Sequence, residues 1–470
     1  MNYSLLLPEL IVAVLGLLLL SVDLYAREKR VLAAIGVVGT VLALIASFSL
    51  FGQEAEIWNG TIRVDDFAAF FKVIFLVVLG LVFLFSGEYL EKREMKVGEF
   101  YVLVTFATLG AMLLASSLNL ITLYLSLELL ALASYALTGM LKQDLRSSEA
   151  SLKFFLVGAL TSGVILYGLS LLYGLSGSVH LLDVRAAVAQ SANPALVAVA
   201  GVLVIAGFGF KVAAVPFHLW APDAYEGAPT PVAAFLITTS EAAGFAALLR
   251  LLLVGLAPVA AQWQLAVAVL AAVTMTYGNI TAIVQTRTKR MLAYSAIAQA
   301  GYVLVGVAVA SQAGVSALMY YLLVYAFMTV GAFTVVTMLS NHVPSEEIED
   351  FKGLSQRSPA FAIAMSLLLL SLIGIPPMAG FFGKFALFRA AVDGGLLWLA
   401  LVMTVNSAIS VPYYFGIIRN MFLKETDDAA PLSTRLGVKV ALGVSVAGIF
   451  LLGIFPEPVV RFLTSAHLLP

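Results

Sequence analysis

The stretch from Phe67 to Gly87, FAAFFKVIFLVVLGLVFLFSG, decides the class of fold, because its only charged residue is Lys72. A helix rises about 1.5 Å per residue and a bilayer core is about 30 Å thick, so roughly 20 apolar residues cross it. Similar runs recur along the 470-residue chain, which is 61% hydrophobic and 11% charged. Soluble domains carry about 25% charged residues. The sequence therefore predicts an all-α polytopic membrane protein.

The apolar runs and their breakers predict about fourteen transmembrane helices within one membrane domain. The connections between them are short, so we expect no inserted soluble domain. We expect residues 1–24 to be a retained first helix, because they lack a basic start and a small-residue cleavage site. The expected spans are 5–24, 31–51, 67–87, 100–116, 118–140, 151–175, 195–215, 230–254, 263–284, 291–310, 313–339, 360–390, 396–422 and 434–455.

Lysine and arginine are distributed unequally between the two sets of loops, and they gather on the cytoplasmic side of membrane proteins. The even-numbered loops and the C-terminal tail hold three, Arg63, Arg185 and Arg461. The odd-numbered loops hold the other fifteen: Arg27, Lys29, Arg30, Lys92, Arg93, Lys96, Lys142, Arg146, Arg287, Lys289, Arg290, Lys352, Arg357, Lys424 and Arg435. We therefore expect both termini outside and an even number of crossings.

The global composition argues against several classes of function. A net charge of −1 without a long basic run argues against nucleic acid as a partner. The chain has no cysteine, so it offers no disulfide and no thiolate for an iron–sulfur cluster. Its four histidines lie far apart, without the spacing of metal ligands. We therefore expect no metal or redox cofactor in this chain and assign redox chemistry to partners.

Eight cations fall inside or at the ends of the expected spans, where a central charge costs roughly 2.5–3.5 kcal/mol. We expect six of them to extend to the interface: Lys72, Lys153, Arg250, Arg389, Arg419 and Lys439. The other two are Lys211 and Lys384. Glu128 lies about eleven residues into its span, roughly 16 Å from the end, which places it near the midplane. Glu9 is expected to be an interface acid rather than part of a path.

Two spans are interrupted by helix breakers beside a lysine. One contains Gly207-Phe208-Gly209-Phe210-Lys211 followed by Pro216 and Pro222, and the other contains Pro376-Pro377 followed by Gly380-Phe381-Phe382-Gly383-Lys384. The two spans are five crossings apart and run in opposite directions, which is typical of an inverted repeat. We expect helices 1–3 in residues 1–98, a first repeat in 99–256, its inverted copy in 262–423, and helix 14 with a tail in 434–470.

The broken spans suit proton transfer, because prolines free backbone groups that need water or protein partners. Desolvation lowers the pKa of a lysine and a nearby carboxylate raises it. A movable ion pair between Glu128 and Lys211 would switch proton release, and water would carry the proton toward Lys384. The alternative is a proline kink with each lysine paired for packing. The run 360–391 is too long for one straight span and must be kinked, tilted or discontinuous.

At these residues the chain resembles the antiporter-like subunits of respiratory complex I, and among them subunit N of bacterial NADH-quinone oxidoreductase. The resemblance covers nearly the whole chain. It rests on Leu7-Pro8-Glu9-Leu10, Glu128-Leu129, Ser148 to Phe155, Pro216 to Asp223, Gly227 to Val232, Lys289 to Ser295 and Gly374 to Lys384.

The resemblance implies fourteen helices with two inverted five-helix bundles and a half-channel in each. It implies a proton relay through Glu128, Lys211 and Lys384, and we expect Glu241 to belong to the same path. Two positions depart from the family pattern: Glu241 replaces a lysine in helix 8, and Gln299 replaces a histidine in helix 10. Glu241 either forms a second acid–base pair with a lysine or is a protonated or water-facing acid. Glutamine cannot titrate, so the central relay is the part of the path in question.

The expected function is proton translocation in a bacterial inner membrane, coupled to NADH oxidation and quinone reduction in partner subunits. FMN, iron–sulfur clusters and quinone are expected in those partners, which connect this subunit to the NADH-oxidising arm. His218, Asp223 and Lys153 are possible accessory residues, although loop-ordering hydrogen bonds are the favoured explanation of His218 and Asp223 over a part in proton entry. The alternatives are a subunit of a cation/proton antiporter or membrane-bound hydrogenase, and an independent transporter or scaffold.

Overall fold

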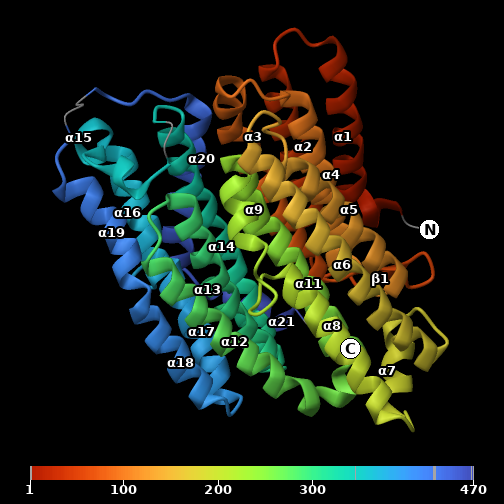
Figure 1. Ribbon diagram of the computed structural model, residues 1–470. Coiled ribbons are helices and arrows are strands. Elements are labelled where there is room, and N and C mark those ends of the chain that lie inside the picture. The colour runs from red at the N-terminus through yellow and green to blue at the C-terminus, as the bar shows by residue number, and fades with distance from the viewer. Residues whose placement is uncertain (1–2, 344–345, 427–429, 467, 469–470) are drawn as a thin grey trace.

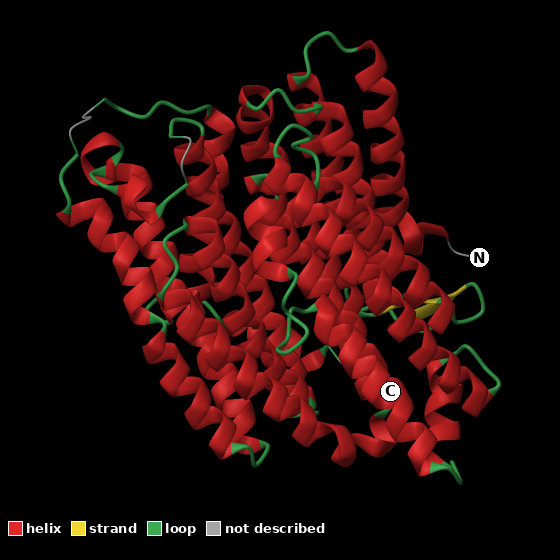
Figure 2. Cartoon of the chain, in the orientation of Figure 1, coloured by secondary structure: helices red, strands yellow, loops and turns green. Residues whose placement is uncertain are grey.

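The computed structural model describes residues 3–343, 346–426, 430–466 and 468. Within these ranges the chain is a bundle of helices with one small antiparallel hairpin, β1 (Ala55–Ile57) and β2 (Ile62–Val64) (Figure 2). Thirteen helices of the described part are long and apolar enough to cross a membrane. The remaining expected span, 360–390, is present as two shorter helices. The prediction of an all-α polytopic membrane protein is confirmed.

The helices run between two ends of the molecule, where the connections lie (Figure 1). Spans one to three are α1 (Leu7–Tyr25), preceded by a 3-10 turn from Tyr3, α2 (Arg30–Phe48) and α3 (Asp66–Lys92). Spans four to six are α4 (Val97–Ser116), α5 (Leu120–Thr138) and α6 (Leu145–Ser176). A short α7 (Leu181–Ala189) precedes span seven, α8 (Pro194–Lys211), which is followed by α9 (Ala221–Gly227).

Span eight is a continuous helix, Thr230–Gly255, that alternates between two geometries: α10 (Thr230–Phe235), a π-helical segment (Leu236–Ser240), α11 (Glu241–Leu249) and a second π-helical segment (Arg250–Gly255). Spans nine to eleven are α12 (Ala260–Ile283), α13 (Thr288–Ala308) and α14 (Gln312–Ser340). A 3-10 turn (Ile348–Phe351) and α15 (Leu354–Arg357) lead to α16 (Pro359–Ile373), α17 (Ala379–Asp393), α18 (Leu397–Ile409), α19 (Val411–Leu423), α20 (Leu436–Ile454) and α21 (Glu457–Ser465).

Spans four to eight and nine to thirteen have corresponding lengths and spacings. The helices α12, α13, α14, α16 and α18 begin between 163 and 168 residues after α4, α5, α6, α8 and α10. Equivalent glycines pack at two helix crossings. A Cβ added to Gly110 would lie 2.8 Å from the backbone nitrogen of Leu130 in α5, and one added to Gly278 would lie 2.5 Å from that of Ala298 in α13. Both crossings thus require glycine for the close approach of two backbones.

Both helices with breakers are interrupted where the sequence predicts. Helix α8 ends at Lys211, and the chain forms turns before α9 begins at Ala221. Helix α16 ends at Ile373, Gly374 adopts a left-handed conformation with φ of 96°, and α17 begins at Ala379. Run 360–391 is therefore discontinuous rather than tilted or smoothly kinked.

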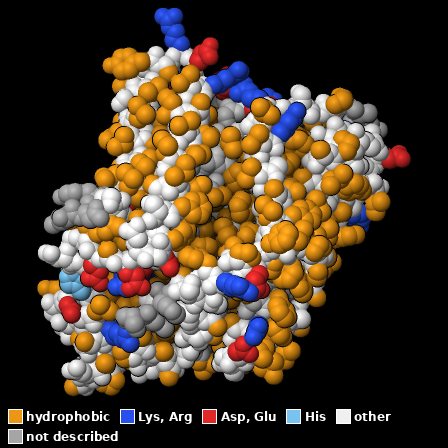
Figure 3. Space-filling model, turned by 180° about the vertical axis from the view of Figure 1, so that it is seen from behind, with side chains coloured by type: hydrophobic (Ala, Val, Ile, Leu, Met, Phe, Trp, Pro, Cys, Tyr) orange, Lys and Arg blue, Asp and Glu red, His pale blue; other side chains and the backbone are white. Residues whose placement is uncertain are grey.

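Charged side chains lie mainly near the two ends of the molecule, while apolar side chains cover most of the face between them (Figure 3). Four of the six cations expected at the interface are exposed, as extension to an interface requires: Lys153, Arg389, Arg419 and Lys439. The same expectation is wrong for Lys72 and Arg250. Lys72 is fully buried, with Nζ 2.7 Å from Oε1 of Glu9. Glu9 is likewise buried, so it is not an interface acid.

Arg250 is also buried, because it pairs with the buried Asp65, the residue that caps the start of α3. Its guanidinium donates two hydrogen bonds to the carboxylate of Asp65, at 2.7 and 2.8 Å, and packs 4.7 Å from the ring centre of Phe67. Two parallel bonds of this kind satisfy both charges away from water. The pair joins the start of α3 to the end of span eight.

Candidate functional site

Glu128 lies on α5, in the middle of the membrane-spanning run, and is partly buried. The hydroxyl of Ser162 on α6 donates a hydrogen bond to Oε1 of Glu128. The hydroxyl oxygens of Ser162 and Tyr124 are 3.0 Å apart. No lysine lies within 4.0 Å of its carboxylate in the described part of the chain. The contact expected between Glu128 and Lys211 is therefore absent from this conformation, and a serine from the neighbouring helix holds the carboxylate instead.

Lys211 is the last residue of α8 and is 5% exposed. Among the described residues it forms no ion pair and no hydrogen bond to protein. Its aliphatic stem packs against Gly244 of α11, where an added Cβ would lie 2.9 Å from Cγ of Lys211. An unpaired buried ammonium is costly in a membrane, so this position needs either hydration or release of the proton. The glycine leaves room for the lysine stem beside span eight.

Glu241 is 2% exposed and follows directly after the π-helical segment 236–240. Such π-helical turns are uncommon and frequently mark functional sites. Its Oε1 accepts a hydrogen bond of 2.7 Å from the hydroxyl of Tyr225 on α9. No lysine among the described residues lies within ion-pair distance of Glu241, so of the two alternatives this conformation contains the acid without a lysine partner. Glu241 is instead a buried acid bound to a tyrosine, three residues before the glycine that contacts Lys211.

Lys384 lies on α17, just beyond the break in span twelve, and is 6% exposed. Its Nζ donates to the carbonyl oxygens of Leu372 and Ile373, at 2.9 and 3.0 Å, which are the last carbonyls of α16. The negative end of a helix dipole favours a cation here. Nζ also lies 4.4 Å from the ring centre of Tyr302, a cation–π contact.

A cavity of about 410 Å³ reaches Lys384. Its polar lining comes from Lys384, Thr404 and Ser407, and the remainder is mainly Phe381, Phe385, Phe388 and Met403. The volume exceeds the roughly 30 Å³ that one water occupies in liquid, but the hollow opens beside the exposed Phe385 and Thr404, so it is a surface hollow rather than an enclosed water site.

Between span eight and Lys384 lies a hydrogen-bonded cluster that sequence reasoning missed. Tyr321 on α14 donates to Oε1 of Gln299, whose Nε2 lies 3.3 Å from the hydroxyl of Tyr414 and 3.4 Å from the carbonyl oxygen of Leu372. Ser295 bonds to Tyr414. The available signal was the number of tyrosines in apolar helices, including Tyr321 and Tyr325 one turn apart, because a buried hydroxyl needs a partner.

The possible accessory residues fall into two separate environments. Asp223 accepts hydrogen bonds of 2.9 Å from both Lys153 and Arg290, and Arg290 also contacts Glu226. Burial acts to raise the pKa of Asp223, but its bonds to Lys153 and Arg290 outweigh burial and hold that pKa below its usual value. These bonds join α6 and α9 to α13. They support the loop-ordering interpretation of Asp223.

His218 is buried between α8 and α9, with its ring centre 4.6 Å from that of Tyr277 on α12. Its Nδ1 has no hydrogen-bond partner in the described protein. It therefore does not share the ion-pair cluster of Asp223, although the two residues are close in sequence.

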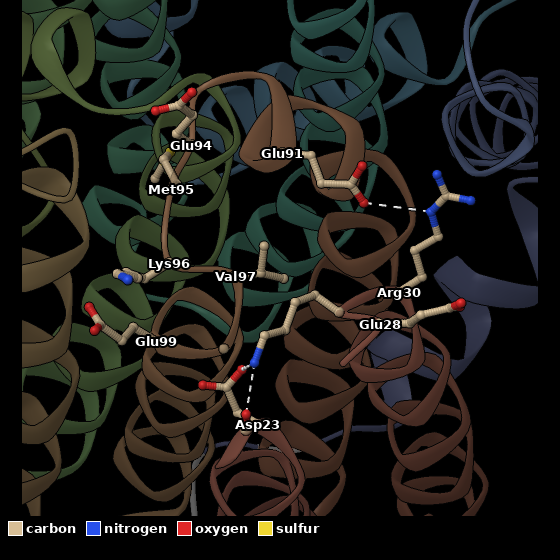
Figure 4. A pocket seen from close by; sticks show the side chains of 11 residues that line it. Asp23, Glu28, Arg30, Glu91, Glu94, Met95, Lys96, Val97 and Glu99 are labelled. Carbon is tan, nitrogen blue, oxygen red and sulfur yellow. Dashed lines mark hydrogen bonds and ion pairs between the residues drawn. The ribbon is translucent and has the colours of Figure 1, made fainter. Parts of the chain in front are cut away.

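A different, charged cavity of about 840 Å³ lies at the loops after α1 and α3, where Lys29 pairs with Asp23 and Arg30 with Glu91 (Figure 4). Glu128, Lys211, Glu241 and Lys384 are not among the residues that line it. The described residues contain no group of three or more His, Cys, Asp or Glu side chains that could hold a metal ion.

The fold and these buried acids and lysines define a polytopic helical protein of the antiporter-like class. The family model of the NADH:quinone oxidoreductase/Mrp antiporter transmembrane region matches residues 117–410. NADH-quinone oxidoreductase subunit N of Heliobacterium modesticaldum is 45% identical, over 99% of each chain. The chain belongs to this family, and within it to the subunit N group of NADH-quinone oxidoreductases.

Two solved structures agree with this assignment of the fold. A chain of respiratory complex I from Thermus thermophilus with bound aureothin is 31% identical, with a TM-score of 0.83 over 98% of this chain and 100% of that one. A chain of the Mrp complex from Dietzia sp. DQ12-45-1b has a TM-score of 0.87 at 21% identity, over 99% and 97%, and shows the shared fold alone.

Proposed function

We propose that the chain is the proton-translocating membrane subunit of an NADH-quinone oxidoreductase, which couples NADH oxidation and quinone reduction in partner subunits to proton movement. The observation that carries this proposal is the series of titratable residues buried in spans five, seven, eight and twelve. A membrane protein has no general reason to bury Lys211, Glu241 and Lys384 without opposite charges, because such residues are costly and mark ion pathways.

In the proposed relay, Glu128, Lys211, Glu241 and Lys384 exchange protons in sequence along the middle of the membrane. Lys211 is paired with Glu128 in one state and separated from it in the state described here. Lys384 exchanges its proton with water in the adjoining cavity, and the carbonyls at the end of α16 stabilise its charged form. Moving one charge across the membrane costs about 2.3 kcal/mol per 100 mV. We therefore infer that conformational or electrostatic changes in neighbouring subunits supply the energy.

The redox groups belong to partner subunits in this proposal, and this chain binds neither FMN, an iron–sulfur cluster nor a metal.

Spans four to eight and nine to thirteen act as inverted repeats, one half-channel each. We propose that both termini lie on the outer side of a bacterial inner membrane, and the excess of cations in the odd-numbered loops supports this orientation. The chain lacks cysteine, so single cysteines at the exposed positions Gln143 and Ala192 test this orientation. An impermeant maleimide should label Ala192→Cys alone in intact cells, and labelling of Gln143→Cys alone would reverse the orientation.

A second candidate is a subunit of a multi-subunit cation/proton antiporter, and the fold shared with the Dietzia Mrp chain favours it. The 45% identity to a subunit N across the full length favours the oxidoreductase more strongly. The two candidates differ in what assembles with the chain and in what drives transport.

The test is to purify the chain from its native membrane through an affinity tag, identify the chains that co-purify, and reconstitute the assembly in vesicles. We expect NADH-oxidising and quinone-reducing subunits, and acidification that requires NADH and quinone. An assembly without redox subunits that exchanges sodium for protons would establish the antiporter instead.

A further inference from the structure

We propose that Tyr321 carries the proton between Glu241 and Lys384, and that Gln299 and Tyr225 position the groups at the two ends of this link. This inference rests on the proposed function. It addresses the part of the path where Gln299, which cannot titrate, stands between the two lysine-containing halves. In this link the proton moves through the hydroxyl group of Tyr321 and through water, and not from one titratable side chain directly to the next.

The first end of the link is Glu241 with two tyrosines. Tyr225 donates to Oε1 of Glu241 at 2.7 Å and is fully buried. Tyr325 on α14 is near enough to interact electrostatically with both Glu241 and Tyr225. Tyr225 fixes the orientation of the carboxyl group at this end.

The middle of the link lies along α14. Tyr321 and Tyr325 are one helical turn apart, and their rings are parallel within 7°, with centres 6.4 Å apart. Tyr321 packs closely against Gly383, where an added Cβ would lie 2.5 Å from its ring. Tyr321 is thus held between the Glu241 end and the residue that precedes Lys384.

The second end is organised by Gln299. The hydroxyl of Tyr321 donates to Oε1 of Gln299, and Nε2 of Gln299 and Nζ of Lys384 both approach the carbonyl oxygen of Leu372. Gln299 therefore accepts the hydroxyl hydrogen of Tyr321 while its own amide group shares the carbonyl oxygen of Leu372 with Lys384. It leaves the oxygen lone pairs of Tyr321 free to accept a proton from the side of Glu241.

The proposed transfer conserves protons and charge. A proton leaves the carboxyl group of Glu241 and reaches the oxygen of Tyr321 through water near Tyr325. The O–H bond that pointed to Gln299 then breaks, and its proton passes through water to a neutral Lys384. Tyr321 gains one O–H bond and loses one, so it ends neutral, and Lys384 ends as an ammonium. Gln299 forms and breaks no covalent bond, which makes it a positioning residue.

The test uses the intact complex in vesicles and compares NADH-driven proton pumping at equal amounts of assembled complex. Tyr321→Phe removes only the hydroxyl. Tyr320→Phe is the matched control, because Tyr320 is the adjacent residue of α14 and its hydroxyl donates instead to the carbonyl of Leu452, at 2.6 Å. We expect Tyr321→Phe to lower pumping about 10-fold or more, since a positioned proton transfer contributes roughly 10²- to 10⁴-fold. Tyr320→Phe should pump within about twofold of the unmodified protein.

Two substitutions test the role of Gln299: one removes its hydrogen-bonding groups, and the other restores them. Gln299→Leu removes the acceptor for Tyr321 and should lower pumping as Tyr321→Phe does. Gln299→His restores an acceptor and a donor, so it should pump within about twofold of the unmodified complex.

Equal pumping by Tyr321→Phe and Tyr320→Phe would overturn the link, as would unchanged pumping by Gln299→Leu. If pumping survives in Lys384→Ala, the relay itself is wrong, which is a different outcome from failure of the link alone. If Tyr321→Phe does not assemble, the Gln299 pair decides.

Discussion

At the scale of single residues, the position of a charge in a span does not show where its side chain lies. Lys72, Arg250 and Lys439 all occur within or at the ends of apolar runs. Only Lys439 is exposed, because Lys72 has Glu9 and Arg250 has Asp65 as partners from distant segments. Asp65 lies 185 residues from Arg250 in the sequence, so no local pattern reveals the pair. The neighbouring breakers single out Lys211 and Lys384 in the sequence, whereas no local pattern shows that Lys72 and Arg250 are buried in ion pairs.

The Asp65–Arg250 pair gives a direct prediction for stability. Asp65→Asn keeps a side-chain oxygen that can accept from the backbone of Ala68, but it removes the charge opposite Arg250. Leaving one partner of a buried pair uncompensated costs about 3–5 kcal/mol. We expect a corresponding loss in the free energy of unfolding in detergent. Arg461→Ala, which removes an exposed pair with Glu457, is the control and should cost less than about 1 kcal/mol. Equal effects of the two substitutions would contradict this account of Arg250.

At the scale of elements, the sequence predicts both helix breaks. It does not predict that the two lysines lie on opposite sides of their breaks. The two Gly-Phe-x-x-Lys strings suggest matching lysines, yet Lys211 ends α8 before its break, whereas Lys384 lies within α17 after its break. The difference follows from the breakers, since Pro216 comes after Lys211 and Pro376-Pro377 come before Lys384. As a result only Lys384 bonds to the carbonyls that a broken helix exposes.

The break in span twelve depends on Gly374. Its φ of 96° is unfavourable for a residue with a Cβ, by roughly 1–2 kcal/mol in the left-handed region. An added Cβ would also lie 3.1 Å from Cδ of Lys384. Gly374→Ala should therefore lower the unfolding free energy by about 1–2 kcal/mol. In the control Gly443→Ala, the added Cβ meets nothing within 4 Å, so this substitution in α20 should be neutral or stabilising. A neutral Gly374→Ala would contradict the role of this turn.

At the scale of the whole molecule, two clusters of polar side chains join helices that are distant in the sequence. One is the ion-pair cluster of Asp223, Lys153 and Arg290, and the other is the tyrosine cluster around Gln299. The residues of the ion-pair cluster can be picked out in the sequence by their charge. The tyrosine cluster forms only because α13, α14, α16 and α19 pack together in the fold. Helix periodicity reports which residues are apolar, and it does not report which buried hydroxyls meet across helices.

The Asp223 cluster predicts how stability changes with pH. Because its pKa is lowered in the folded state, Asp223 stabilises the fold fully above its unfolded pKa, about 3.9, and this contribution is lost as the pH falls through the lower folded value. Asp223→Asn should cost about 1 kcal/mol, given partial exposure. The difference in unfolding free energy between the variant and the unmodified protein should stay constant from pH 8 to 5 and shrink only below about pH 4. Shrinkage between pH 8 and 6 would point to another group.

The central claim is that protons cross through the buried lysines at the helix breaks. The most direct measurement is NADH-driven acidification by the reconstituted complex carrying Lys211→Ala or Lys384→Ala, with the exposed Lys439→Ala as the matched control. The account predicts that both relay variants lose about 10-fold or more of the pumping rate, within the roughly 10²- to 10⁴-fold contribution of positioned proton transfer, while the control keeps it. Unchanged pumping by both relay variants, at normal assembly, would contradict the account.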